Sequence, residues 1–266
     1  MTMRKITPKK VYNWLQRKVV NIYDASIDRR ITGKSLVKYV PSTDRNDEEG
    51  IGRTGSQPTP YMVLKRIFSH VELTEKDSFL DVGCGKGRVL AYLVKIKAPC
   101  HITGIEISDE AGAVASEWSD LYDQVTVIRG DVFAQNLNDY TVFFLNRPFL
   151  PKTFLQFIEK FEKDVRHPIT LLYWVDQQSG GYLKNRPGWT MTHREKIFKI
   201  HGLMMASCPQ GFSVWKYEPT REPEPSIGVS DALLTMYLPY GKVVYDLEEK
   251  SSGAKRTERW REKKRG

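Results

Sequence analysis

No stretch of this 266-residue chain limits the choice of fold more than residues 79–90, which read F-L-D-V-G-C-G-K-G-R-V-L. Apolar residues suited to a buried strand lead into three glycines at alternate positions, and an apolar-periodic run beginning at Val89 indicates a helix start. Glycines between a strand and a helix adopt backbone angles closed to other residues, and they let a ligand lie directly on the main chain. The first amide N–H groups of the helix then point at that ligand. The stretch therefore predicts a cofactor-binding loop.

The spacing of these glycines discriminates between classes of cofactor. A dinucleotide-binding fingerprint would place its third glycine at position 88, where this chain has Arg88, and a phosphate-binding P-loop would need Ser or Thr after Gly-Lys. Asp81 and the glycines instead give the pattern D-x-G-x-G-x-G, which resembles motif I of the class I S-adenosylmethionine-dependent methyltransferases. The resemblance covers roughly residues 55–218, and it implies a methyltransferase with S-adenosyl-L-methionine as its cofactor.

Segments of strand and helix character alternate after the glycine loop. Strands are expected at 101–107, 124–129, 140–145 and 167–175, with helices at 88–97 and 109–122 and another lined by Phe154, Phe157, Ile158 and Phe161. Such alternation predicts an α/β fold with a parallel, doubly wound sheet. Residues 189–200 and 212–218 read as late strands, which the resemblance places at an antiparallel edge. We therefore expect a mostly parallel, Rossmann-like methyltransferase sheet with an antiparallel edge strand and an N-terminal helical extension.

Composition divides the chain into four segments. They are a basic N-terminal helical extension and loop (1–54), the methyltransferase domain (55–218), a linker with an appended hairpin of strands 233–238 and 243–247 (219–249), and a basic disordered tail (250–266). An amphipathic helix over 8–23 carries apolar residues at helical spacing: Val11, Trp14, Leu15, Val19 and Ile22. We expect this apolar stripe to pack on the domain, with a membrane-surface or partner helix as the alternative.

The residues just before the glycine loop carry two further expectations. Thr59 precedes Pro60, which predicts an N-cap followed by a first-turn proline. The resemblance implies that residues upstream of motif I fold over the cofactor, which here would involve Thr54, Gln57 and Tyr61. A plain surface loop is the alternative.

Acidic residues lie at or just after three of the expected strand ends. In an open parallel sheet, ligands bind outside the carboxyl ends of the strands. The resemblance implies that Asp81 fixes the loop and the methionine amino group, that Glu106 accepts both ribose hydroxyls, and that Asp131 or an adjacent amide reads the adenine amino edge. An acid at Glu106 is shared with NAD-binding proteins. The expected cofactor-binding residues are Asp81, Gly83, Cys84, Gly85, Gly87, Glu106, Ile107, Asp131 and Val132.

The fourth strand end continues as Asn146-Arg147-Pro148-Phe149. This is similar to the [D/N]-P-P-[Y/F] motif of methyltransferases that act on planar amines, in which the Asn or Asp accepts the amine hydrogens and the aromatic ring stacks on the acceptor. Arg147 replaces the first proline. Asn-x-Pro-Phe loops are also similar to those of bacterial methyltransferases related to the lysine methyltransferases of the DOT1 type. The expected catalytic residues are Asn146, Pro148 and Phe149, and a structural turn is the alternative.

Charge is unevenly distributed along the chain, whose net charge is +9. Residues 1–40 hold ten Lys or Arg against two Asp or Glu, and residues 250–266 hold eight against two, so the middle of the chain is net acidic. Basic ends attract nucleic-acid phosphates or anionic lipid, whereas a solvated helix face or a disordered tail is the alternative reading. Nucleic acid is thus a candidate partner, and the sequence names neither the methyl acceptor nor the oligomeric state.

Cysteine usage indicates a reducing compartment. The three cysteines, Cys84, Cys100 and Cys208, are odd in number and widely spaced, which argues against zinc, disulfides and iron–sulfur clusters. The five histidines show no paired spacing, and we expect no metal site. Neither a signal peptide with an apolar core nor a run of membrane-spanning length is expected, so cytoplasmic localisation is the default.

The activity implied by the resemblance is transfer of a methyl group to a nitrogen or oxygen acceptor by in-line displacement. Such a reaction depends mostly on positioning, which can contribute ~7–11 kcal/mol. One alternative is a nucleic-acid-binding protein that retains the fold without turnover and uses the basic ends with Trp14 and Trp260. An NAD-linked oxidoreductase is another, for which no hydride-handling residue is found.

Overall fold

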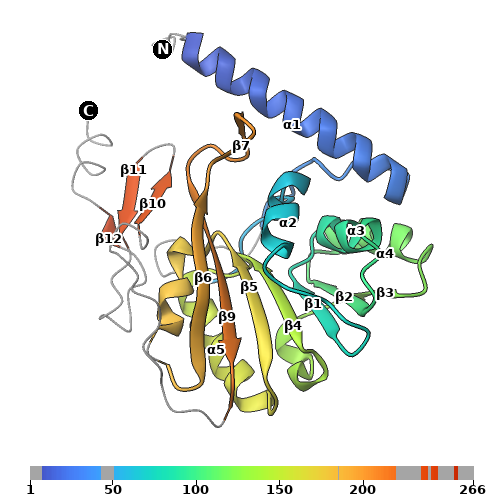
Figure 1. The fold of residues 1–266 in the computed structure, drawn as a ribbon, viewed down its shortest axis with the longest axis vertical. Helices are drawn as coiled ribbons and strands as arrows, with labels where there is room; N and C mark the ends of the chain where they lie inside the picture. Colours follow the sequence, from blue (N-terminus) through green and yellow to red (C-terminus); the bar gives the residue numbers. More distant parts are fainter. Residues whose placement is uncertain are drawn as a thin grey trace.

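A seven-stranded sheet of order β3-β2-β1-β4-β5-β9-β6 forms the centre of the computed structural model (Figure 1), which describes residues 8–42, 51–184, 186–219, 235–238, 241–244 and 255–256. The strands are β1 (Ser78–Val82), β2 (His101–Glu106), β3 (Val125–Arg129), β4 (Val142–Asn146), β5 (Ile169–Trp174), β6 (Trp189–Ile197) and β9 (Gln210–Tyr217). Strands β1 to β5 are parallel, and β9 runs antiparallel to both β5 and β6. The predicted Rossmann-like sheet with an antiparallel edge is confirmed.

Helices and short elements connect these strands. The helices are α1 (Pro8–Thr32), α2 (Tyr61–Phe68), α3 (Arg88–Lys95), α4 (Asp109–Ser119) and α5 (Pro151–Asp164), with short 3-10 turns η1 (Val132–Ala134), η2 (Leu137–Asp139), η3 (Asp176–Gln178) and η4 (Gly180–Leu183). The strands β7 (Lys199–Ile200) and β8 (Leu203–Met204) form a separate hairpin. A further small sheet contains β10 (Thr235–Leu238), β11 (Gly241–Val244) and β12 (Lys255–Arg256). The rest of the predicted tail at 250–266 lies outside the described residues.

Each face of the central sheet packs against its own set of helices, because successive strand residues point in opposite directions. Phe144 belongs to the core cluster shared with α2, α3 and α4, whereas Phe143 belongs to the cluster shared with α5. Figure 1 shows α5 on the opposite side of the sheet from α2 and α3. Phe154 and Phe157 of α5 are fully buried, and loss of such an aromatic ring costs about 3–5 kcal/mol. The doubly wound arrangement therefore rests on two apolar layers.

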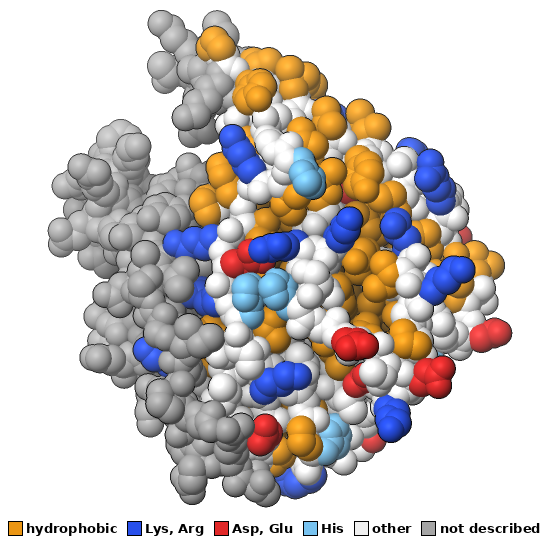
Figure 2. Space-filling view, viewed as in Figure 1, with side chains coloured by type: hydrophobic (Ala, Val, Ile, Leu, Met, Phe, Trp, Pro, Cys, Tyr) orange, Lys and Arg blue, Asp and Glu red, His pale blue; other side chains and the backbone are white. Residues whose placement is uncertain are grey.

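The predicted packing of the apolar stripe on α1 is wrong. The stripe residues Val11, Trp14, Leu15, Val19 and Ile22 are between 43% and 68% exposed. Figure 2 shows hydrophobic side chains gathered along the edge of the molecule where α1 runs. The helix instead turns toward the domain a mixed face that includes Val20, Asp24, Ile27 and Asp28. It also extends to Thr32, nine residues beyond the predicted end.

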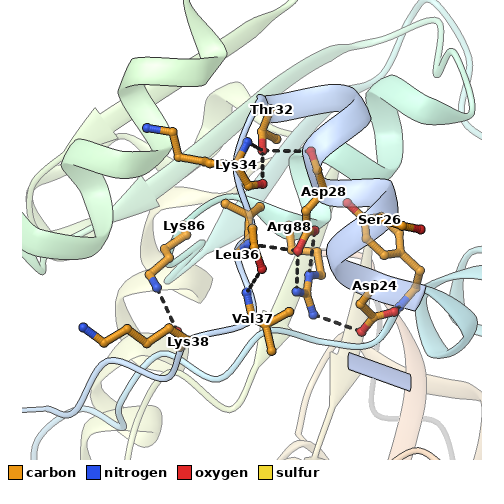
Figure 3. A network of polar contacts seen from close by, with 12 residues as sticks. Asp24, Ser26, Asp28, Thr32, Lys34, Leu36, Val37, Lys38, Lys86 and Arg88 are labelled. Carbon is orange, nitrogen blue, oxygen red and sulfur yellow. Dashed lines mark hydrogen bonds and ion pairs between the residues drawn. The ribbon is translucent and has the colours of Figure 1, made fainter. Parts of the chain in front are cut away.

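Buried ion pairs explain why α1 docks through this mixed face. Figure 3 shows the guanidinium of Arg88, the first residue of α3, between two carboxylates of α1. Its Nε and Nη2 lie 3.1 and 2.7 Å from the two oxygens of Asp28, and its Nη1 lies 3.1 Å from Asp24 Oδ2. Asp24 and Asp28 also accept the main-chain N–H groups of Tyr61 and Leu36. The helix is thereby tied to the residue that directly follows the glycine loop.

Within the described part of the chain, no helix combines the length and the apolar character needed to cross a membrane.

Candidate active site

The glycine loop joins β1 to α3 in a left-handed backbone conformation. Gly83, Gly85 and Gly87 have φ angles of 73°, 59° and 85°, values that side chains other than glycine's rarely accept. A Cβ on Gly85 would lie 2.1 Å from Ser56 Oγ, and a Cβ on Gly87 would lie 2.7 Å from the ring of Trp118. Both the backbone angles and the limited space therefore favour glycine at these positions.

Glu106 holds this loop from the end of the neighbouring strand β2. Its Oε2 accepts the main-chain N–H of Gly85 at 2.7 Å, and its Oε1 accepts that of Ser108 at 2.8 Å. The side chain is 7% exposed. Burial raises the pKa of Glu106, and hydrogen bonds from Ser108 and Gly85 act in the opposite direction. The carboxylate thus fixes the loop and keeps further acceptor capacity at the site.

Asp81 sits beneath the loop near the end of β1 with an unmet hydrogen-bonding requirement. Its side chain is 2% exposed, and Oδ2 has no hydrogen-bond partner within the described part of the chain. Burial, followed by the neighbouring charge of Glu106, raises the pKa of Asp81 well above its usual range. Buried carboxylates are costly unless paired, so this position fits a ligand that brings a positive charge or a hydrogen-bond donor.

One cavity of about 530 Å³ brings the predicted site residues together, a size within the range of small-molecule sites. Its walls include every predicted cofactor-binding residue except Gly85 and Gly87, namely Asp81, Gly83, Cys84, Glu106, Ile107, Asp131 and Val132. The predicted catalytic residues Asn146, Pro148 and Phe149 also line it. The cavity opens at the carboxyl ends of the strands, as expected for an open parallel sheet. The individual roles of these residues stay predictions.

Residues 51–59, which we call the strap, supply part of the cavity wall through residues 53–59. The strap pairs with the chain that follows β4: Thr54 N–H donates to Pro148 O at 2.9 Å, and Leu150 N–H donates to Gly52 O at 2.9 Å. Thr54 and Gln57 line the cavity. Tyr61, which we grouped with them, instead lies 3% exposed in the core. The polar character of the strap predicted a loop, but no local pattern signalled its pairing with residues almost a hundred positions away.

Asp131 is engaged on both carboxylate oxygens. Its Oδ1 accepts the N–H of Phe133 at 3.0 Å as the N-cap of η1, and its Oδ2 pairs with Arg53 of the strap at 2.7 Å. Sequence reasoning missed Arg53. An adenine ring that bound to Asp131 would have to share these oxygens with Phe133 and Arg53. The neighbouring main chain of Val132 is therefore the more available group for binding adenine.

Asn146 stands where the first cavity meets a second one of about 270 Å³. Its Nδ2 donates to Gln57 O at 2.8 Å and to Thr59 Oγ1 at 3.0 Å, while its amide oxygen has no hydrogen bond to any described residue. The prediction that Thr59 caps α2 is wrong, because Pro60 takes the N-cap position and the Thr59 hydroxyl accepts from Asn146 instead. Asn146 therefore ties the strap to the strand end and presents a free acceptor beside both cavities.

The residues after Asn146 differ in their surroundings. Arg147 has a φ of 43°, a strained conformation of the kind that clusters at functional sites. The ring of Phe149 is 3% exposed and lies 5.1 and 5.9 Å from the rings of Phe157 and Phe133. Stacking of Phe149 on a planar acceptor would require the ring to leave this packing.

Part of this sequence matches a known protein family. Residues 79–153 match the family model described as a methyltransferase domain. A protein-lysine N-methyltransferase of Saccharolobus islandicus is 28% identical over 88 residues, which are 32% of this chain and 55% of that protein. The chain therefore spans about half the length of this curated relative.

Two solved structures are also similar. An RNA methyltransferase from Salinibacter ruber in complex with S-adenosyl-L-homocysteine is 19% identical, with a TM-score of 0.44, 65% of this chain covered and 97% of that one. A methyltransferase from Pyrococcus furiosus is 13% identical, with a TM-score of 0.49, 76% of this chain covered and 98% of that one.

Proposed function

We propose that this chain, which carries a class I S-adenosylmethionine-dependent methyltransferase domain, binds S-adenosyl-L-methionine in the larger cavity and transfers its methyl group to a nitrogen or oxygen acceptor. The observation that carries the proposal is the convergence of Asp81, Glu106 and the glycine-loop residues Gly83, Cys84 and Lys86 on one cavity at the carboxyl edge of the sheet. The match of residues 79–153 to a methyltransferase domain supports it.

The residues of the cavity suit the chemical groups of this cofactor. Asp81 Oδ2, buried and without a hydrogen-bond partner among the described residues, would receive the methionine ammonium. Glu106 already accepts one N–H on each oxygen, and its remaining lone pairs would accept the ribose hydroxyls. The N–H groups of Gly83, Cys84, Gly85 and Gly87 already donate to acceptors within the protein, so among the amides of the glycine loop that of Lys86 would face the carboxyl end. When bound, the cofactor supplies an electrophilic methyl group on a sulfonium that is a good leaving group.

On the acceptor side, we assign the orienting role to Asn146. Its Nδ2 is held by the strap, so its amide oxygen is fixed where it can accept a hydrogen bond from an amine or hydroxyl. The smaller cavity is lined by Asn146 together with Arg147, Trp174 and Cys208. An acceptor entering from that side would meet the methyl group at Asn146. A general base is required only if the acceptor arrives protonated, as a lysine does.

Nucleic acid is a candidate partner, and the exposed charges of α1 support this interpretation. Arg17, Lys18, Arg29 and Arg30 are exposed, whereas both acidic residues of the helix are buried against Arg88. The solvent face of the helix therefore carries positive charge, which attracts phosphates. The curated relative is a protein-lysine N-methyltransferase, so a protein lysine is the competing acceptor. The proposal places the protein in the cytoplasm, where its three free cysteines stay reduced.

The test is incubation of the purified chain with cofactor labelled on the methyl group and with protein, RNA, DNA and small-molecule fractions of a cell extract. The proposal predicts label in one fraction when the wild-type chain is present and almost none with Asn146→Ala. Absence of label from every fraction, under conditions where the cofactor is bound, would contradict the assigned turnover.

A further inference from the structure

A cluster of potential metal ligands lies outside the two cavities, between α2 and the edge strand β6. It consists of His70, two residues after α2, and His193 and Glu195 of β6. The Nε2 atoms of both histidines lie 3.8 Å from the same carboxylate atom, Glu195 Oε1. One donor atom from each side chain lies within 4.8 Å of the other two. His70 lies 123 positions before His193 in the sequence, so no local spacing predicted the cluster.

In each of the two imidazoles, one ring nitrogen has no hydrogen-bond partner among the described residues. Their rings stack with centroids 3.9 Å apart and planes inclined by 23°, and both rings pack against Phe212. Each Nε2 is buried and has no hydrogen-bond partner within the described part of the chain. Buried polar atoms without partners are uncommon in folded proteins and require an explanation. Two of them beside one carboxylate oxygen point to a shared ligand.

We propose that His70, His193 and Glu195 bind a divalent transition-metal ion of the Zn²⁺ class. Imidazole nitrogen and carboxylate oxygen are ordinary zinc ligands at about 2.0–2.2 Å, which places two donors of a tetrahedral ion roughly 3.3–3.6 Å apart. The two Nε2-to-Oε1 separations of 3.8 Å are close to that range, and all three donor atoms lie within 4.8 Å of one another. Three protein ligands leave a fourth position for water.

Arg66 provides the charge that Glu195 needs when no ion is bound. Its Nε and Nη2 lie 3.0 and 3.1 Å from the two oxygens of Glu195, and its side chain is 55% exposed. The guanidinium can swing into solvent, because it is held only at the surface. A bound ion would then connect α2 to β6 in place of the arginine, and the two cations would compete for one carboxylate.

Calorimetric titration of the untagged full-length chain with ZnCl2, together with metal analysis after dialysis, tests the site. We expect one ion per chain. The zinc affinity should fall about 100-fold or more in His193→Gln and in Glu195→Gln, because losing a ligand should cost at least as much as the roughly 10–100-fold typical of losing a residue that only orients a ligand. Arg66→Gln should bind zinc several-fold more tightly, because the competing charge is gone. His201→Asn, which removes an exposed imidazole elsewhere, should bind like the wild type.

Circular dichroism on each variant identifies any substitution that prevents folding. If His193→Gln does not fold, the zinc affinity of Glu195→Gln still tests the site, because the Glu195 side chain is partly exposed. Substitution by Co²⁺ adds a visible spectrum that reports the coordination number. Absence of zinc binding by the wild type would overturn the proposal. Binding of equal strength in the wild type, His193→Gln and Glu195→Gln would overturn it as well, because the ion would then lie elsewhere.

Discussion

The Oε2 atom of Glu106 accepts a hydrogen bond from the main-chain N–H of Gly85 across 2.7 Å. This contact joins the end of β2 to the middle of the glycine loop. Glu106 itself lines the larger cavity. The same carboxylate therefore shapes the loop and, in our proposal, binds the ribose of the cofactor.

Glu106→Gln should weaken S-adenosyl-L-methionine binding about 10- to 100-fold, because a hydrogen bond to a charged acceptor contributes ~1.5–3 kcal/mol. Glutamine keeps one oxygen for the Gly85 N–H, so the circular dichroism spectrum should not change. Calorimetry measures the affinity. Glu110→Gln, at the rim of the same cavity, is the matched control and should leave it unaltered. Equal affinities for wild type and Glu106→Gln would remove the ribose role.

Arg88→Met should destabilise the fold by about 3–5 kcal/mol, because it leaves Asp24 and Asp28 buried without their partner. Urea unfolding measures the change. Arg129→Met is the control: its pair with Asp109 lies at the surface, with side chains 49% and 92% exposed, and its loss should cost less than ~1 kcal/mol. Similar losses in the two variants would mean that the α1 contact is not a buried anchor.

Asp24 should make stability depend on pH. Burial, partly offset by Arg88, raises the pKa of Asp24 to about 6, from 3.8 in its ordinary state. Between these values the folded protein binds the proton more tightly than the unfolded chain does. The free energy of unfolding should therefore fall as pH rises from about 4 to about 6 and then level off.

Comparing urea unfolding of wild type and Asp24→Asn across this pH range isolates the contribution of Asp24, since other buried carboxylates act in both proteins. The wild type should lose more stability than the variant as pH rises. Asp123→Asn, an exposed acid, should follow the wild type. Parallel curves for wild type and Asp24→Asn would refute the assigned shift.

Local sequence signals predicted the parts of the site that depend on consecutive residues. The glycines at positions 83, 85 and 87 have left-handed backbone angles that other residues rarely adopt. Strand ends located Glu106 and Asn146 at one edge, because parallel strands bring their carboxyl ends together.

Features that depend on distant pairings were not predictable in this way. The sequence predicted the wrong docking face of α1, because hydrophobic periodicity counts Asp24 as a solvent-exposed residue. In the structure Asp24 is buried and pairs with Arg88, 64 residues away. Arg88 itself entered only as a departure from a glycine pattern. The strap has no periodicity, and its position follows from pairing with the residues after β4.

Asn146→Ala should reduce turnover about 100-fold, the scale of loss caused by a misplacement of about 1 Å, while changing cofactor affinity much less. Single-turnover kinetics and calorimetry separate the two effects. Thr59→Val is the control, because it removes one hydrogen bond to the strap and leaves the amide oxygen of Asn146 in place. If Asn146→Ala loses affinity and turnover equally, or if Thr59→Val matches it, then Asn146 only holds the strap.

The most direct measurement is calorimetric titration of the full-length chain with S-adenosyl-L-methionine, S-adenosyl-L-homocysteine and NAD in parallel. Our account predicts that the first two bind with one molecule per chain and that both affinities fall in Glu106→Gln, whereas NAD gives no binding heat. Binding of NAD in the absence of binding by either adenosyl compound would contradict the assignment of this cavity.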